Sequence, residues 1–299
     1  MGDFSAAGDG FEQALALYQE TGAKHRQGII LSELCHIHTV LGEFSAAHQR
    51  LQDAFALSLE TGEISIRVNL HLLAGWLALE VGDLAGAERA MAQTDALLPD
   101  NQTREQVCLA YLAWSRFWQY RGQLAKACVF GDKALALARS QEKRKLPNCA
   151  IRLGLALLEM EQPAAARDLF AEALQIWEER NQPHLAAEAR AGLALAALAR
   201  DELATAVTHV EAILQFLDRP ALPNSFLGLQ EPGQTYLTCF RVLQAVGDGR
   251  GTAVLEEALA FLQKRAATLD ETQRQSFWEN IPSHRRLAAA VKEGEIKGS

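Results

Sequence analysis

The stretch "LGEFSAAHQRLQDAFALSLETG", from Leu41 to Gly62, decides the fold because a close copy of it occurs elsewhere in the chain. Residues 1–22, "MGDFSAAGDGFEQALALYQETG", align with it without a gap. Weaker copies follow along the sequence, and the alanine that marks each copy stands at Ala7, Ala47, Ala87, Ala127, Ala166, Ala206 and Ala253. The spacings are 40, 40, 40, 39, 40 and 47 residues. A period held this closely indicates stacked repeats rather than separate globular domains.

Each period divides into two apolar-periodic stretches separated by a turn. In the clearest repeat these stretches are residues 64–81 and 84–98, and Gly82 stands between them. Glycine adopts left-handed dihedrals at low cost, so it ends the first helix, and Pro99 ends the second. The sequence therefore predicts about fifteen helices in antiparallel pairs, with no β-sheet.

Small residues recur at one position of the first helix in each pair. They stand twelve positions before the marking alanines, at Cys35, Gly75, Ser115, Gly154 and Ala194. Small side chains at fixed positions let the two helices of a hairpin approach closely.

This pattern resembles the tetratricopeptide repeat. The resemblance covers about residues 1–268, and it departs in period, which is 40 here against the usual 34. The longer period is similar to that of the long-repeat branch found in bacterial regulators. The resemblance implies an all-α, right-handed superhelical solenoid of antiparallel helix pairs with a C-terminal helical cap.

Two segments stand outside the period. Residues 218–232, "DRPALPNSFLGLQEP", are expected to form an ordered loop, with either a structural or a ligand-shaping role. Residues 270–291 are similar to a tail that closes such arrays in large bacterial multidomain regulators, through Phe277-Trp278, Asn280, Pro282 and His284-Arg285. We expect two short helices broken at Pro282, with Ser283 as an N-cap, that cover the last hydrophobic face. The predicted domains are a repeat array over 1–269, capping helices over 270–293 and a tail over 294–299.

The first copy lacks the helix that precedes it in every other repeat. Residues 3–21 are predicted to form a lone second helix, so we expect the sequence to be part of a longer protein. Phe4, Phe11, Leu15 and Tyr18 would then lie near or on an uncovered face, which would promote self-association.

Composition narrows the class of partner and the compartment. The net charge of −8 argues against direct binding of nucleic acid, and 49% apolar with 22% charged residues indicates a folded protein. The five cysteines have no metal-ligand spacing and fall in apolar helices, which indicates reduced thiols in the cytoplasm. No apolar run is long enough for a membrane span, and no signal peptide precedes the first repeat.

No motif of catalysis is found in the sequence. It contains no Gly-x-x-x-x-Gly-Lys phosphate loop and no Gly-x-Ser-x-Gly elbow. His36 and His38 would point about 200° apart on a helix, so they are poor joint metal ligands. We therefore expect a protein that is not an enzyme and that needs no cofactor or metal.

The remaining candidate is a surface. In the resembled family, the first helix of each pair lines the concave side of the superhelix. Carried onto this sequence, the inward positions include His36, Asn69, Leu72, Trp76, Tyr111, Arg116, Gln119, Asn148 and Ile151, followed by Leu155 and Leu158. Aromatic and arginine anchors beside amides suit a peptide or protein segment. In a second interpretation, Trp76 and Tyr111 simply fill a narrow superhelix axis.

The function expected is therefore a protein- or peptide-interaction or sensor module. The resemblance implies a place in a larger bacterial signalling regulator of the signal-transduction ATPase type, in which other domains of the same chain are also partners. The alternative is a small-metabolite sensor that binds its effector inside the superhelix. An enclosed cavity with convergent polar groups would favour the metabolite, and an open groove would favour the peptide.

Overall fold

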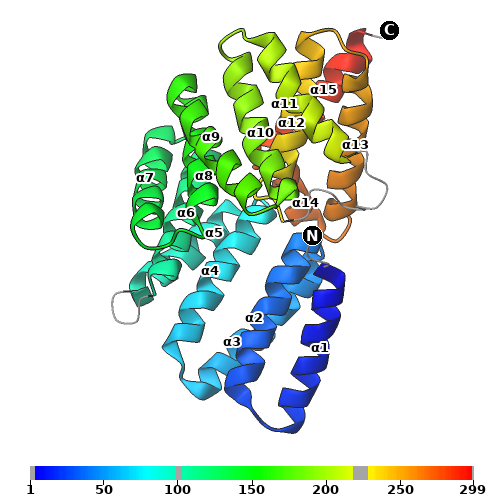
Figure 1. Ribbon diagram of the computed structural model, residues 1–299. Coiled ribbons are helices and arrows are strands. Elements are labelled where there is room, and N and C mark those ends of the chain that lie inside the picture. Colours follow the sequence, from blue (N-terminus) through cyan, green and yellow to red (C-terminus); the bar gives the residue numbers. More distant parts are fainter. Residues whose placement is uncertain (1–3, 99–102, 218–227, 298–299) are drawn as a thin grey trace. The chain divides into compact units, whose positions relative to one another are not determined.

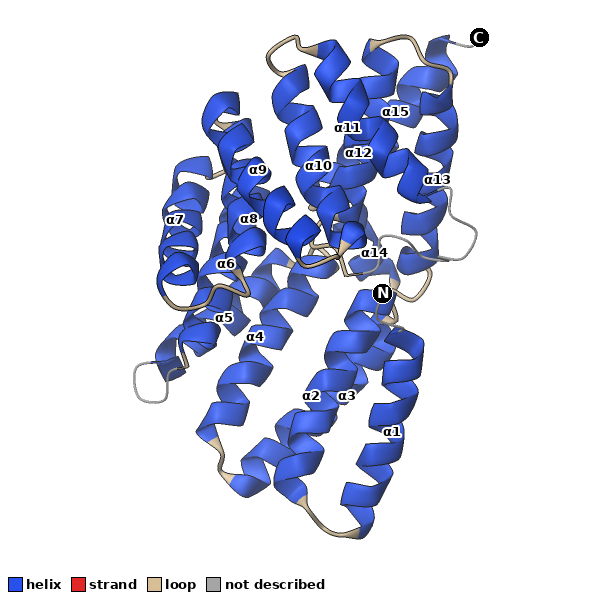
Figure 2. Cartoon of the chain, viewed as in Figure 1, coloured by secondary structure: helices blue, strands red, loops and turns tan. Residues whose placement is uncertain are grey.

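The computed structural model describes residues 4–98, 103–217 and 228–297, and it is helical throughout (Figure 2). Within these residues fifteen helices and no strand are found, as the sequence predicts. The helices are α1 (Phe4–Glu20), α2 (Lys24–Leu41), α3 (Phe44–Thr61), α4 (Ile64–Glu80), α5 (Leu84–Leu97), α6 (Arg104–Tyr120), α7 (Leu124–Ser140), α8 (Leu146–Glu159), α9 (Pro163–Glu179), α10 (Pro183–Leu198), α11 (Leu203–Leu217), α12 (Pro232–Ala245), α13 (Arg250–Ala266), α14 (Glu271–Glu279) and α15 (Pro282–Lys297). The bounds of α4 and α5 match the predicted pair within one residue at each end. Most of the segment at 218–232 lies outside the described residues.

The chain forms two compact units, and each is described by itself. Unit 1 comprises residues 1–117 and 264–280, and unit 2 comprises residues 118–263 and 281–299. In unit 1, α2 packs against α3 and α4 (Figure 1). In unit 2, α8 packs against α9, α10 packs against α11, and the first helices α8, α10 and α12 also contact one another in order. These contacts are the paired and layered packing that the 40-residue period predicts.

Small residues hold the helix pairs close together. The marking alanines Ala47, Ala87, Ala127, Ala166 and Ala206 are all fully buried. Opposite them, the small positions of the first helices are buried as well, and Phe170 lies against one of these, Gly154, and against Gly192 of α10. A Cβ added to Gly154 or Gly192 would come within 3 Å of the Phe170 ring. The glycines therefore make the space that this ring fills.

The turn between the helices of a pair keeps one backbone conformation even where its sequence weakens. Gly42, Gly82 and Gly122 have φ between 70° and 79°. In the later repeats the equivalent position is held by Glu161, with φ 59°, and by Asp201, with φ 60°. Only glycine adopts this left-handed region without strain, so tertiary packing rather than local preference fixes the later turns.

The segment 264–280 of unit 1 packs on the turns of the first two helix pairs. Arg265, 7% exposed, donates from Nη1 to the carbonyl oxygen of Val40 at 2.9 Å, and so satisfies the C-terminus of α2. The Nδ2 of Asn280 donates to the carbonyl oxygen of Gly82 at 2.9 Å. A Cβ on Gly82 would lie 2.3 Å from the carbonyl oxygen of Ser276, so α14 sits directly against this turn. The tail over residues 270–291 was expected to cover the last hydrophobic face. Its first part, α14 with Asn280, lies instead on the early turn at Gly82, while α15 packs against α12 in unit 2.

Two details of the sequence analysis are wrong. Ser283 does not cap a helix, because it lies inside α15 and its buried Oγ has no hydrogen-bond partner. The break comes instead from Pro282, which begins α15, while α14 is capped by Asp270 together with Gln273. Ala253 does not mark the last repeat, because it is exposed, and the neighbouring Val254 is buried in its place.

Helix α1 precedes the first complete helix pair, and its apolar face is more exposed to solvent than the equivalent face of α3. Phe44, Ala47 and Leu51 are buried. Their equivalents on α1 are two half-buried residues, Phe4 and Phe11, and an exposed one, Ala7, although Leu15 is buried. Among the described helices, none is long and apolar enough to pass through a membrane.

Candidate functional site

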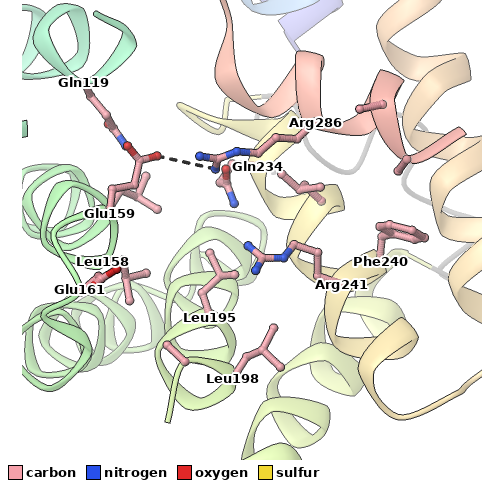
Figure 3. A pocket seen from close by; sticks show the side chains of 15 residues that line it. Gln119, Leu158, Glu159, Glu161, Leu195, Leu198, Gln234, Phe240, Arg241 and Arg286 are labelled. Carbon is pink, nitrogen blue, oxygen red and sulfur yellow. Dashed lines mark ion pairs between the residues drawn. The ribbon is translucent and has the colours of Figure 1, made fainter. Parts of the chain in front are cut away.

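A cleft of about 670 Å³ opens in unit 2 between the first helices of the later pairs and α15 (Figure 3). We call it the Arg241 cleft. It is lined by Gln119, Leu155, Leu158, Glu159, Glu161, Leu195, Leu198, Ala199, Gln234, Leu237, Phe240, Arg241, Arg286, Ala289 and Ala290. This volume lies in the range of small-molecule and peptide side-chain sites, which are about 300–1,000 Å³.

The apolar floor of the cleft follows directly from the repeat. Leu155 and Leu158 stand three residues apart on α8, so they share one face of that helix. Leu195 and Leu198 stand 40 residues later on α10, at the equivalent positions. The sequence predicted the first pair as inward-facing and missed the second, although the 40-residue period alone was the signal that places it.

The charged side chains that line the cleft are two arginines and two glutamates, and they are poorly paired with one another. Arg241 of α12 and Arg286 of α15 both point into it (Figure 3). Burial, and then the positive charge of Arg286, lower the pKa of Arg241. The Nη1 of Arg286 lies 3.8 Å from Oε1 of Glu159, whose pKa is raised, chiefly by burial. Arg286 therefore has one distant carboxyl partner, whose charged form is disfavoured, and Arg241 makes no ion pair with the described residues.

Behind the cleft, the fully buried Arg152 of α8 organises a polar cluster. Its Nη1 donates to Oε1 of Gln119 at 3.0 Å and to Oε1 of Glu231 at 3.1 Å. The hydroxyl of Tyr120 also donates to Glu231, at 3.0 Å. These bonds connect α6, α8 and the start of α12, and so fix the walls from which the cleft residues project.

Glu188 of α10 completes this buried cluster. It accepts hydrogen bonds from the backbone N–H of Glu231 at 2.7 Å and of Gln230 at 3.3 Å, at the start of α12. Burial raises the pKa of Glu188 to about 7, against the attraction of Arg152. Two carboxyls share one buried arginine, so a neutral Glu188 balances the charge of the cluster.

The sequence-predicted residues of unit 1 do not form one open groove. Asn69 lines a smaller pocket of about 220 Å³ between α2 and α4, together with Ile29 and Ser32. His36 is exposed. Leu72, at 2% exposure, instead packs in a core with Val68, Leu98 and Ala110.

Trp76, Tyr111 and Arg116 were predicted to anchor a ligand in a solvent-exposed groove. Arg116 is instead buried and paired within the chain. Arg116 is 2% exposed, and its Nη1 pairs with Oε1 of Glu80 at 2.7 Å. Its guanidinium lies 5.7 Å from the ring centre of the half-buried Trp76. Glu80 also pairs with Arg265 at 3.1 Å. Arg116 is therefore held by its own chain, and reversing its charge would perturb folding rather than probe a ligand.

The three predicted residues of unit 2, Gln119, Asn148 and Ile151, lie in different environments. Gln119 lines the Arg241 cleft. Ile151 is fully buried in the core, and the half-buried Asn148 receives a hydrogen bond on its backbone oxygen from Gln230. Within the described residues, no group of three or more His, Cys, Asp or Glu side chains could hold a metal ion.

Comparisons with solved structures agree with this fold. The chain is similar to a signal-transduction ATPase with a tetratricopeptide repeat sensor from Pyrococcus horikoshii, with 15% identity, a TM-score of 0.57 and coverage of 84% of this chain. It spans 39% of that ATPase's length. It is also similar to a Rap protein complexed with competence and sporulation factor, with 12% identity, a TM-score of 0.58, and coverage of 95% of this chain and 85% of that one.

A third neighbour is NprR in complex with its cognate peptide NprX, with 14% identity, a TM-score of 0.55, and coverage of 98% of this chain and 99% of that one. No protein-family model and no curated protein matches the chain. At these identities the likeness establishes a fold of the tetratricopeptide type and leaves the ligand to the geometry of the site.

Proposed function

We propose that this chain is a non-catalytic interaction module that binds a peptide or protein segment in the Arg241 cleft. The observation that carries the proposal is the cleft itself, in which two leucines three residues apart on α8, and two more on α10, lie beside poorly paired arginines. An amphipathic segment offers apolar side chains at matching intervals and polar groups for the rim. One structural neighbour is in complex with its cognate peptide and another with competence and sporulation factor, which supports the same kind of ligand.

The proposal extends to the setting of the module in a larger protein. We propose that the chain is the repeat part of a larger bacterial signalling regulator in the cytoplasm. In that regulator, other domains of the same protein would also be partners of the repeats. The similar ATPase carries its repeats as a sensor and is much longer than this chain. In this setting the repeats over residues 1–269 are followed by α14 and α15, and α15 extends to Lys297, past residue 294, where the tail was predicted to begin. His36, Asn69, Trp76 and Tyr111 would offer a second contact surface in unit 1.

A small metabolite is the second candidate ligand. The volume of the cleft and its convergent Arg241, Arg286 and Gln234 side chains favour it. The apolar floor favours the peptide, because a small polar effector would leave the half-buried Leu158, Leu195 and Leu198 uncovered.

Selection of short peptides from a display library tests the proposal. Ala289→Trp places a large side chain on the exposed lining of the cleft, and Ala171→Trp places the same side chain on exposed α9 as a control. We expect peptides that bind the parent chain and Ala171→Trp but not Ala289→Trp. A library that yields no binder, or binders that ignore Ala289→Trp, would overturn the proposal.

A further inference from the structure

We propose that the Arg241 cleft selects a peptide by one acidic side chain, held between Arg241 and Arg286, beside apolar side chains that cover the leucine floor. This inference rests on the proposed function and adds to it the chemical class of the ligand. It concerns charge complementarity within unit 2, where both arginines and all lining residues lie.

The two arginines have unused binding capacity. Within the described part of the chain, Arg241 makes no ion pair, and Arg286 meets a carboxylate only at Glu159, 3.8 Å away. A charge-assisted hydrogen bond between a guanidinium and a carboxylate is about 2.7–2.9 Å long. The pair with Glu159 is therefore a weak contact, and the donors of both arginines remain available to a ligand.

An anion between the arginines relieves their mutual repulsion. Burial, and after it the positive charge of Arg286, lower the pKa of Arg241. Glu159 compensates poorly, because burial raises its pKa and so opposes its own ionisation. A ligand carboxylate would be attracted by both cations, and this attraction would offset the cost of removing the carboxylate from water.

The floor of the cleft distinguishes a peptide from a free carboxylic acid. Leu155 and Leu158 on α8, with Leu195 and Leu198 on α10, give two apolar rows; Leu155 is 7% exposed and the other three are half-buried. Covering these rows needs side chains about the size of leucine, and each buried methylene group contributes about 0.8 kcal/mol. A small acid satisfies the arginines and leaves the rows exposed to water.

The experiment compares short peptides selected on the parent chain with synthetic versions in which each glutamate or aspartate is replaced by its amide. The protein variants are Arg241→Gln and Arg286→Gln, and Arg167→Gln on exposed α9 is the control. We expect the amide change at one peptide position to weaken binding by about tenfold, about 1.4 kcal/mol. Arg241→Gln and Arg286→Gln should each weaken binding of the acidic peptide by about the same factor and should leave binding of its amide version unchanged. The affinity for the acidic peptide should also fall as the salt concentration rises.

Different results would overturn the acidic selection and the proposed function. Peptides that are excluded by Ala289→Trp but are neutral, and bind Arg241→Gln and Arg286→Gln as well as the parent, would leave the function standing and overturn the acidic selection. If free glutarate competes with the acidic peptide at equal concentration, the apolar floor adds nothing and the peptide part of the proposal is wrong. If no peptide binds, both proposals fail.

Discussion

The buried Glu188 gives a prediction that can be worked out from the structure. Its pKa of about 7 compares with an ordinary value of 4.5. Because the folded state holds this proton more tightly than the unfolded chain, the stabilisation is complete below the unfolded pKa and is lost as the pH rises through 7. Each pKa unit corresponds to about 1.4 kcal/mol, so the full effect is about 3 kcal/mol.

The perturbation is Glu188→Gln, which keeps an oxygen acceptor for the N–H groups of Gln230 and Glu231 and removes the titration. The free energy of unfolding of the parent and the variant is measured by urea denaturation from about pH 5 to about pH 8. The difference should move by about 2.5 kcal/mol in favour of the variant over this range. Any fixed cost of placing an amide near Arg152 shifts both ends of the range equally.

The difference between the two proteins, rather than either curve alone, tests the reasoning, because all other titrating groups are shared. Glu179→Gln, at an exposed glutamate of α9, controls for the loss of a carboxyl group. If the difference between parent and Glu188→Gln stays constant from about pH 5 to about pH 8, Glu188 is ionised throughout. Arg152 would then hold both carboxylates, and the charge balance described for the cluster would be wrong.

Three further predictions concern packing. Gly192→Ala should lower the free energy of unfolding by about 1–3 kcal/mol, because the added Cβ would lie 2.3 Å from the Phe170 ring. Urea denaturation measures this change, and a variant as stable as the parent would show that the ring moves aside without cost. Gly82→Ala should displace α14 and reduce the hydrogen-exchange protection of residues 271–280, whereas unchanged protection would contradict the close contact at this turn. Leu17→Glu, at a residue 62% exposed on α1, and Phe11→Glu should shift sedimentation toward the monomer, and a parent that is already monomeric would refute the predicted self-association.

Most of the fold could be predicted from the sequence because the period is carried by residues whose role is steric. Gly75 and Gly154 stand where two helices approach closely, and the marking alanines stand opposite such positions. Where the mark weakens, at Glu161 and Asp201, the helices on either side still force the same turn. The prediction failed at Ala253, where the last repeat departs from the period by several residues.

The site could be predicted only in part, because helix phase gives direction but not partners. Leu155 and Leu158 were placed correctly by phase, and the same phase one period later gives Leu195 and Leu198. Arg116 has the correct phase too, but Glu80, 36 residues earlier, neutralises it. Arg286 lies in the tail outside the period, so no repeat pattern could have brought it to the cleft.

Photo-crosslinking is the most direct test of whether the peptide binds in the Arg241 cleft. A selected peptide carrying benzoylphenylalanine next to its acidic residue is irradiated with the parent chain, and the labelled residues are identified by mass spectrometry. We predict labels on α8, α10, α12 and α15, among the residues that line the cleft, and their loss with Ala289→Trp. Labels confined to unit 1, or to the second helices α9 and α11, would contradict the account.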